Sequence, residues 1–391
     1  MVDSTGPRRL LFISNGHGED SIAAEIIRRL PGGVVAEAYP VIGEGLAYAN
    51  VCAVVGPRAQ VASEGWRNVR WSLLRDLVSG GVGALVPGLE FCRRVVGHYD
   101  GVVVVGDIVG VALCWLAGLR NVVYLDVYKT GYGRLYWPIE RWLIGRTAAA
   151  VFCRSERLAA PLRSRGIDAR CAGNVMMDTI TYGDYDAQSR RTRPRAVTLL
   201  PGSRQFTAAN FTLQVEALSM IAPDRRPDIF LAAAGGVSLE ALARSAGLAV
   251  KGPMTGEAGD GGTLVGAGLT VHVARGAAGN VIEAADLVLS QAGTATIQAL
   301  GLGKPVVAFV GARDRRSRVR SESALFGEAR QLVSAHAERL AEATERLLAD
   351  PDECRRLGAV GRDRIGDPGA ILAIVETIAR CPQRSAATID A

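Results

Sequence analysis

The stretch 290–305 constrains the fold of this chain more than any other part of the sequence. Short apolar runs precede and follow it, and both are typical of buried parallel strands. Between them, Gly293 and Thr294 begin a pattern that predicts a short helix. A strand that turns through glycine into a helix directs free backbone N–H groups at one point, and the helix dipole favours an anion such as phosphate there. The alternative is an ordinary strand-turn-helix without a ligand.

A second strand-to-turn pattern, at 197–204, strengthens the prediction of a phosphate site. Its apolar strand ends at Gly202, which lets a ligand approach the backbone closely. Ser203 offers a hydroxyl, and Arg204 offers a planar guanidinium that suits phosphate. Because parallel strands end at the same edge of a sheet, we expect the two turns to border one crevice.

The composition is that of a globular protein with a full core. Of the 391 residues, 49% are hydrophobic and 21% are charged, and this length favours two domains. The net charge of +6 suits an anionic ligand or membrane surface, although many enzymes are as basic. The seven scattered cysteines include no Cys-x-x-Cys pair, which is typical of free thiols in a reducing compartment. Without zinc-ligand spacing, a signal segment or a long apolar run, the sequence predicts a cytoplasmic protein that needs no metal or other cofactor.

Strands and helices alternate along most of the chain, which predicts an α/β protein of two Rossmann-like, doubly wound domains. The N-terminal domain is predicted at 1–188. An arginine-rich polar run, 184–195, is interpreted as the linker, so the second domain is predicted at 189–368. The remaining segment, 369–391, begins with a helical pattern and ends in a frayed tail.

The first predicted strand passes into a helix through a polar loop that is a candidate site. Its loop residues permit tight backbone geometry: Asn15, Gly16 and Gly18. His17 and Glu19 are expected to point into a crevice. The alternative is a turn in which Glu19 or Asp20 only satisfies the helix N-terminus.

Asp107 follows a run of valines that predicts a central parallel strand. An acid at the carboxyl end of such a strand is well placed to act as a base. The alternative is that Asp107 is the N-cap of the following helix.

Together these motifs resemble those of a known family. Leu-Leu-Pro-Gly-Ser-Arg at 199–204 and Ala-Gly-Thr-Ala-Thr at 292–296 are similar to motifs of lipid-A-disaccharide synthase and its relatives. Ser-Asn-Gly-His-Gly-Glu-Asp at 14–20 is most similar to the lipid-A-disaccharide-synthase-related proteins. The resemblance covers about residues 9–310. It implies a GT-B glycosyltransferase fold with two domains facing a central cleft, and a last helix, within 369–391, that packs back on the N-terminal domain.

The resemblance also implies an activity. It indicates an inverting hexosyltransferase that moves a sugar from a nucleotide-diphosphate donor, such as UDP-GlcNAc or a derivative, to a lipid or glycolipid acceptor. Asp107 would deprotonate or orient the acceptor, with His17 and Glu19 as further catalytic candidates. Many relatives have Glu where this chain has Gln298, which can still hydrogen-bond the ribose hydroxyls without a charge. The donor is expected to bind the C-terminal domain through Gly202, Ser203, Arg204, Gln291, Gly293, Thr294, Ala295, Thr296 and Gln298.

Other functions and partners follow from what the motifs leave open. A UDP-sugar 2-epimerase is one rival, although its Gly-Thr-Arg-Pro-Glu type motif is missing, and a non-catalytic sugar-nucleotide-binding protein is another. Residues 66–94 interleave Trp and Arg with apolar residues, which predicts peripheral contact with the inner face of the cell membrane, and Trp137 and Trp142 extend this pattern. The alternative is a core helix with snorkelling arginines. No basic stripe with stacking aromatics predicts a nucleic-acid partner, and the oligomeric state stays open.

Overall fold

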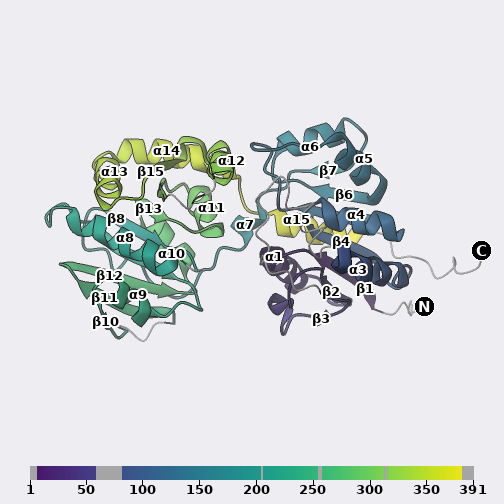
Figure 1. Cartoon of the computed structure of the whole chain (residues 1–391), viewed down its shortest axis with the longest axis horizontal. Helices are drawn as coiled ribbons and strands as arrows, with labels where there is room; N and C mark the ends of the chain where they lie inside the picture. Colours follow the sequence, from purple (N-terminus) through teal and green to yellow (C-terminus); the bar gives the residue numbers. More distant parts are fainter. Residues whose placement is uncertain are drawn as a thin grey trace, which may run out of the picture. The chain divides into compact units, whose positions relative to one another are not determined.

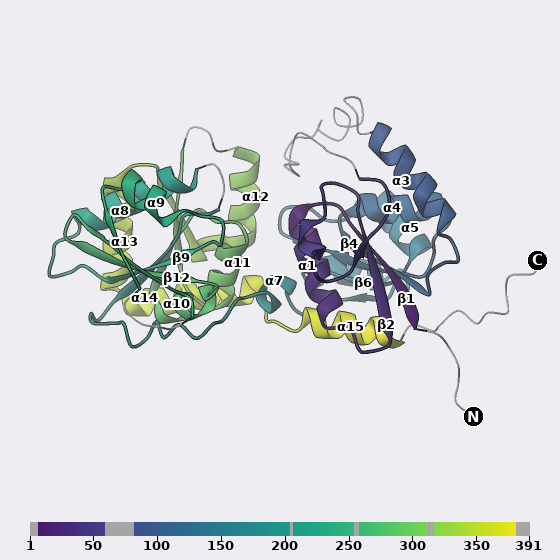
Figure 2. The ribbon, with the colours of Figure 1, turned by 90° about the horizontal axis from the view of Figure 1, so that it is seen from below.

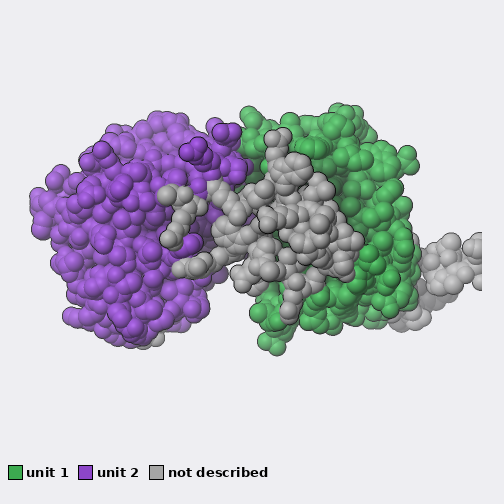
Figure 3. Space-filling model, in the orientation of Figure 1, with its two compact units in different colours: residues 1–175, 369–391 green, residues 176–368 purple. Residues whose placement is uncertain are grey.

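The chain divides into two units, which Figure 3 colours green and purple. The computed structural model describes residues 7–58, 82–203, 206–253, 258–311, 314 and 316–380. Unit 1 comprises Met1–Val175 and Gly369–Ala391, and unit 2 comprises Met176–Pro368. Each unit has its own sheet and its own hydrophobic core, so each is described separately.

The described residues of unit 1 form a seven-stranded parallel sheet with the order β3-β2-β1-β4-β5-β6-β7. The strand order reverses between β1 and β4, which makes the carboxyl ends of these two strands the topological switch point. Its strands are β1 (Arg8–Ser14), β2 (Val34–Pro40), β3 (Ala53–Val54), β4 (Gly101–Gly106), β5 (Val122–Asp126), β6 (Ala148–Phe152) and β7 (Ala169–Arg170).

Helices cover this sheet in two groups (Figure 1 and Figure 2). The helix α4 packs on both α3 and α5, and α1 packs on α15. The valines of β4 are buried because both faces of the strand are covered. The helices of unit 1 are α1 (His17–Arg28), the 3₁₀ turn η1 (Leu46–Tyr48), α3 (Val82–Arg94), α4 (Ile108–Ala117), α5 (Pro138–Thr147), α6 (Glu156–Arg163) and α15 (Ala370–Arg380).

The described residues of unit 2 form an eight-stranded sheet with the order β10-β11-β12-β9-β8-β13-β14-β15. The strands from β12 to β15 in this order are parallel, and β10 and β11 add an antiparallel edge. Its switch point lies between β8 and β13. The strands are β8 (Ala196–Leu200), β9 (Asp228–Ala233), β10 (Ala249–Lys251), β11 (Asp260–Gly266), β12 (Leu269–Arg275), β13 (Leu287–Ser290), β14 (Val306–Val310) and β15 (Arg330–Ser334).

Helices of unit 2 bury their apolar faces on this sheet. In α13, residues Leu340, Thr344 and Leu347 lie on one face and are fully buried, as the three- and four-residue spacing of an amphipathic helix requires. The helices are α7 (Val175–Asp178), α8 (Thr207–Met220), α9 (Leu239–Ser245), α10 (Ala278–Ala284), α11 (Thr294–Gly301), α12 (Arg316–Phe326), the 3₁₀ turn η3 (Gly327–Ala329), α13 (Ala337–Ala349) and α14 (Pro351–Ile365).

The arginine-rich run that the sequence analysis interpreted as a linker belongs to unit 2. Arg190 pairs with the buried Asp260 at 3.2 Å, and its guanidinium lies over the ring of Tyr185. Arg191 pairs with Asp286 at 3.0 Å. Unit 2 therefore begins at residue 176 and not near 188. The two arginines make ion pairs within this unit, whereas the arginines of a linker would be exposed to solvent.

The last helix, α15, is part of unit 1. Arg8 at the start of β1 donates through Nη1 to the carbonyl of Ile378 at 2.6 Å. Arg170 in β7 donates to the hydroxyl of Thr377 at 2.7 Å. These bonds tie the helix to strands at two places in the sheet, so the end of the chain completes the N-terminal core. Among the described helices, none is both long and apolar enough to span a bilayer.

Candidate functional site

The switch point of unit 1 brings together two residues that are far apart in the sequence. In the sheet, Ser14 at the end of β1 pairs with Val105 of β4. The residues that follow these strands therefore meet, and Asn15 Nδ2 donates to Asp107 Oδ1 at 2.6 Å. Because this is where Rossmann-like domains place ligands, the Asn15–Asp107 pair is the candidate site of unit 1.

Asp107 is also the N-cap of α4. Its Oδ1 accepts a hydrogen bond from the backbone N–H of Val109 at 2.9 Å. The capping alternative therefore holds, and the same oxygen receives the Asn15 amide. Gly106 makes this possible, since its φ is +151° and a Cβ there would clash with Asn15 Oδ1.

A buried hydroxyl cluster fixes the loop between β1 and α1. Ser14 Oγ donates to Asp20 Oδ1 at 2.6 Å and lies 2.6 Å from the hydroxyl of Tyr48 in η1. All three side chains are buried, and burial raises the pKa of the Tyr48 phenol well above its ordinary range. Sequence reasoning considered Asp20 only as a helix-end residue and did not connect Ser14 of the same motif with Tyr48, because no local pattern links residues 14 and 48.

The loop itself carries the other candidates of the N-terminal motif. Gly16 is the N-cap of α1 and provides no side-chain cap, and the half-buried Glu19 folds back over it. His17 is the first residue of α1, and its side chain lies outside the described residues. Gly18 is exposed at the helix start. The loop therefore presents backbone next to the Asn15–Asp107 pair.

A second acid lies beside Asp107, at the end of the neighbouring strand β5. Asp126 is fully buried and accepts hydrogen bonds from the Tyr136 hydroxyl at 2.6 Å and from the backbone N–H groups of Tyr128 and Lys129 at 2.9 Å each. Burial raises its pKa from 3.8 to about 6. The Lys129 ammonium pairs with Glu140 of α5 at 2.8 Å. This network fastens the segment between β5 and α5, and sequence reasoning did not find it.

The two glycine turns of unit 2 lie side by side at the switch point of its sheet. β8 pairs with β13 so that Leu200 is opposite Ser290, and Gln291 N–H donates to the Leu200 carbonyl at 2.9 Å. Gly202 has φ +98°, and a Cβ there would lie 3.6 Å from the carbonyl oxygen of Gln291. The glycine conformation thus closes the first turn against the second.

The turn before α11 is fixed by buried hydroxyl groups and exposes its backbone to solvent. Thr296 Oγ1 donates to the Ala292 carbonyl at 2.6 Å and lies 2.6 Å from Ser290 Oγ, and both hydroxyls are buried. Gly293 and Thr294 are exposed at the helix start. The exposed backbone N–H groups at this end of α11 are the groups that bind anions. Ser203 is exposed in the neighbouring turn, and Arg204 lies outside the described residues.

Gln298 and Gln291 have partners within unit 2. Gln298 is buried, and its Nε2 donates to the Met176 carbonyl at 3.0 Å and to the Thr179 hydroxyl at 3.5 Å. Gln291 donates through Nε2 to the Phe309 carbonyl at 2.8 Å. Gln298 therefore fastens α7 to α11, a role that the expected contact with ribose hydroxyls did not include.

The stretch 66–94 is described only from residue 82, and its side chains only from residue 86. In this part Cys92 is fully buried and Phe91 packs on Tyr39 with the ring centroids 4.9 Å apart. The described part thus contributes to the core, while the tryptophans at 66 and 71 lie outside the described residues. Within the described part of the chain, no group of three or more His, Cys, Asp or Glu residues could hold a metal ion.

Comparison with known proteins shows the fold. No protein-family model and no curated protein matches the chain. Solved structures match nearly all of it. MurG from Acinetobacter baumannii matches with a TM-score of 0.57 and 15% identity, over 95% of this chain and 99% of that chain. The glycosyltransferase SnogD from Streptomyces nogalater matches with a TM-score of 0.59 and 16% identity, over 96% and 100%. A UDP-N-acetylglucosamine 2-epimerase matches with a TM-score of 0.52 and 14% identity, over 96% and 98%.

The chain has the GT-B fold. Its two Rossmann-like domains match those of the GT-B glycosyltransferases among these structures, which confirms the predicted fold class. At such low identity the likeness establishes the fold and not the activity. Function must therefore be argued from the two switch-point sites.

Proposed function

We propose that this protein is an inverting glycosyltransferase that transfers a sugar from a UDP-linked donor to a hydroxyl of a lipid or glycolipid acceptor. The observation that carries the proposal is the pair of glycine turns at the switch point of unit 2, where Gly202 lies against Gln291. Two turns with exposed backbone at the start of a helix suit a diphosphate. The matching epimerase is named for a UDP-sugar, which supports the choice of nucleotide.

Unit 1 would supply the acceptor chemistry. Asp107 accepts the acceptor proton while the hydroxyl oxygen attacks the anomeric carbon and the bond from that carbon to the diphosphate oxygen breaks. Asn15 holds the carboxylate through the 2.6 Å hydrogen bond. The proton then passes to solvent, directly or through His17, and the nucleotide diphosphate leaves. The N-terminus of α11 and Arg204 would stabilise the charge on the leaving group.

The acceptor and the location are supported by sequence motifs alone. The motifs at 14–20, 199–204 and 292–296 resemble those of enzymes that glycosylate lipids. A lipid acceptor would bring the protein to the inner face of the cell membrane from the cytoplasm. We propose no metal, because a helix N-terminus and Arg204 can carry the diphosphate charge in its place.

Two measurements test the donor assignment. UDP at a hundredfold its dissociation constant should stabilise the protein by about 2.7 kcal/mol in thermal unfolding, whereas a nucleotide that does not bind should have no effect. Arg204→Ala should weaken UDP binding by about 1.5–3 kcal/mol in calorimetry. If no nucleotide stabilises the wild type, the proposed donor site is wrong.

A UDP-sugar 2-epimerase is the second candidate, because an epimerase shares the fold over nearly the whole chain. Incubation with UDP-GlcNAc and no acceptor separates the two activities. An epimerase converts the donor to its 2-epimer, whereas a transferase releases UDP only when a lipid extract is added. Binding without either product would indicate a sugar-nucleotide-binding protein.

A further inference from the structure

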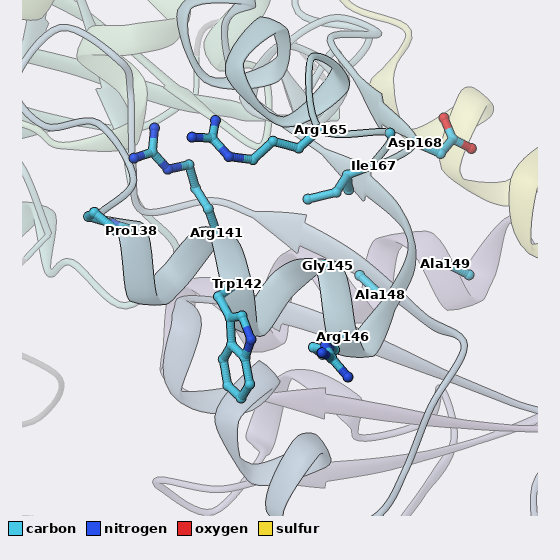
Figure 4. A pocket seen from close by; sticks show the side chains of 11 residues that line it. Pro138, Arg141, Trp142, Gly145, Arg146, Ala148, Ala149, Arg165, Ile167 and Asp168 are labelled. Atoms are coloured by element: carbon cyan, nitrogen blue, oxygen red, sulfur yellow. The ribbon is translucent and has the colours of Figure 1, made fainter.

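A cavity of about 520 Å³ lies on unit 1 along α5 and is lined by arginines. Within α5 its lining residues recur three and four positions apart, at Pro138, Arg141, Trp142 and Gly145, so they share one face of the helix. Arg165 approaches from the segment after α6. Figure 4 shows the guanidinium groups of Arg141 and Arg165 reaching toward the same part of the cavity from these two elements. We call this cavity the arginine pocket.

The positive charge of the arginine pocket is not neutralised by the described residues. Arg141, Arg146 and Arg165 form no ion pair with any described residue. Within the described part of the chain, the buried Nε of Arg141 has no hydrogen-bond partner. Asp168 also lines the pocket, but its carboxylate is paired with Arg170 at 2.6 Å. Arg141 and Arg165 thus bring two guanidinium groups without an ion pair to one part of the cavity, which suits a phosphate group. The Arg146 guanidinium lies over the ring of Trp142, 5.8 Å from its centroid, and adds positive charge at a distance from these two.

Large apolar side chains are exposed on the segment that enters α5. Leu135, Trp137 and Ile139 have exposed fractions of 53%, 66% and 62%, and Trp142 in the pocket is 44% exposed. A cluster of exposed apolar residues on a soluble surface marks an interaction site. Tryptophan among apolar and arginine residues is typical of the boundary between lipid headgroups and acyl chains.

Buried hydrogen bonds fix the segment that carries these apolar residues. The backbone N–H of Trp137 donates to Glu140 Oε2 at 2.7 Å, and the same oxygen accepts a hydrogen bond from the Lys129 ammonium. Tyr136, one residue before, is buried and bonded to Asp126. The exposed side chains therefore stand on a segment that a buried polar network fastens, so their exposure is a fixed feature of the surface.

We propose that the arginine pocket binds the phosphate of an anionic phospholipid headgroup, while Leu135, Trp137 and Ile139 insert at the headgroup boundary. Unit 1 would dock on a bilayer through this face. The arginines together with the exposed apolar side chains favour a lipid over a soluble phosphate compound. A soluble compound in the pocket would not contact Trp137 and Ile139, which lie outside the pocket lining. The inference deepens the membrane location in the proposed function by naming the surface that would make the contact, and its test needs neither donor nor acceptor.

The arginine pocket is separate from the candidate catalytic site. Ala148 and Ala149, which begin β6, and Asp168, which precedes β7, line it. The pocket thus extends toward the amino ends of these strands, whereas Asp107 follows the carboxyl end of β4.

Vesicle co-sedimentation of the full chain tests the proposal. We expect binding to mixed phosphatidylglycerol–phosphatidylcholine vesicles, weaker binding at high salt, and none to pure phosphatidylcholine vesicles. Arg141→Gln, Arg146→Gln and Arg165→Gln should each weaken binding about fivefold, and the triple variant on the order of a hundredfold. The same loss of net charge in unit 2, through Arg225→Gln, Arg339→Gln and Arg355→Gln, is the control. These arginines pair with Glu345, Glu342 and Asp352, and their loss should change binding less than about threefold, which is below the effect expected for one membrane-facing charge.

The apolar part of the surface has its own control. The double variant Trp137→Ala, Ile139→Ser should weaken binding at least tenfold, an order-of-magnitude figure for removing two buried apolar side chains. Leu372→Ser, which replaces an equally exposed residue (65%) on α15, should leave binding unchanged. Trp137, Ile139 and Leu372 are all exposed, so these variants should keep the wild-type melting temperature, and that measurement will show that they fold.

Three outcomes overturn the proposal. Equal losses in the pocket triple and its unit 2 control would mean unspecific attraction. Retained binding in the α5 variants, with loss in Trp66→Ala, Trp71→Ala, would move the contact to the stretch outside the described residues. If glycerol phosphate raised the melting temperature of the wild type and the protein did not bind vesicles, the pocket would be assigned to a soluble phosphate compound.

Discussion

Replacing Asp126 by asparagine should stabilise the protein at neutral pH and not in acid. The carboxylate is fully buried, and its pKa is raised from 3.8 to about 6 because burial disfavours the charged form. Asparagine preserves the shape. Its carbonyl oxygen can accept from the N–H groups of Tyr128 and Lys129, and its amide can donate to the Tyr136 oxygen.

The magnitude follows from the difference between the pKa of the unfolded and folded states. A folded-state pKa that is raised means that the folded protein holds the proton more tightly. The stability due to Asp126 is therefore complete below about pH 3.8 and is lost as the pH rises to about 6. The whole loss is about 3 kcal/mol, and about 2 kcal/mol of it falls between pH 4.5 and pH 7.5.

Urea unfolding of the wild type and Asp126→Asn at these two pH values measures the effect. The free-energy difference between variant and wild type should shift by about 2 kcal/mol in favour of the variant on going from pH 4.5 to pH 7.5. A constant cost, such as the lost attraction to Lys129, cancels in this comparison if Lys129 stays charged. A difference that is the same at both pH values would refute the reasoning, because Asp126 would then titrate normally in the folded state.

Three further predictions concern the candidate sites. Asp107→Asn keeps the cap and removes the base, so it should lower turnover by about 10²–10⁴-fold and leave UDP affinity unchanged in calorimetry; wild-type turnover would exclude Asp107 from the chemistry. Gly106→Ala needs an unfavourable φ and displaces Asn15, so it should cost about 1–3 kcal/mol in urea unfolding and reduce turnover; a fully stable, active variant would contradict the Asn15–Asp107 arrangement. Gln298→Glu places a carboxylate against the Met176 carbonyl and should destabilise by about 2–3 kcal/mol at neutral pH; unchanged stability with tighter UDP binding would show that residue 298 faces the donor.

Local patterns in the sequence determined the secondary structure and the class of fold. Apolar runs such as the valines of β4 predict buried parallel strands, and the glycine turns after β8 and β13 predict phosphate-binding loops. These features depend on neighbouring residues only, through backbone conformation and strand burial. The arginine-rich run at 184–195 misled the same reasoning, because sequence does not show that Arg190 has a buried acid 70 positions away.

Strand order and burial were decided by the tertiary structure. The Asn15–Asp107 hydrogen bond exists because β4 pairs with β1 and not with β3, and no local pattern encodes that choice. Burial at the end of β5 likewise turns Asp126 from an ordinary acid into one with a raised pKa. Packing gives Gln298 a carbonyl partner in α7. Each of these properties depends on contacts between distant segments, which form only when the sheet and its covering helices are assembled.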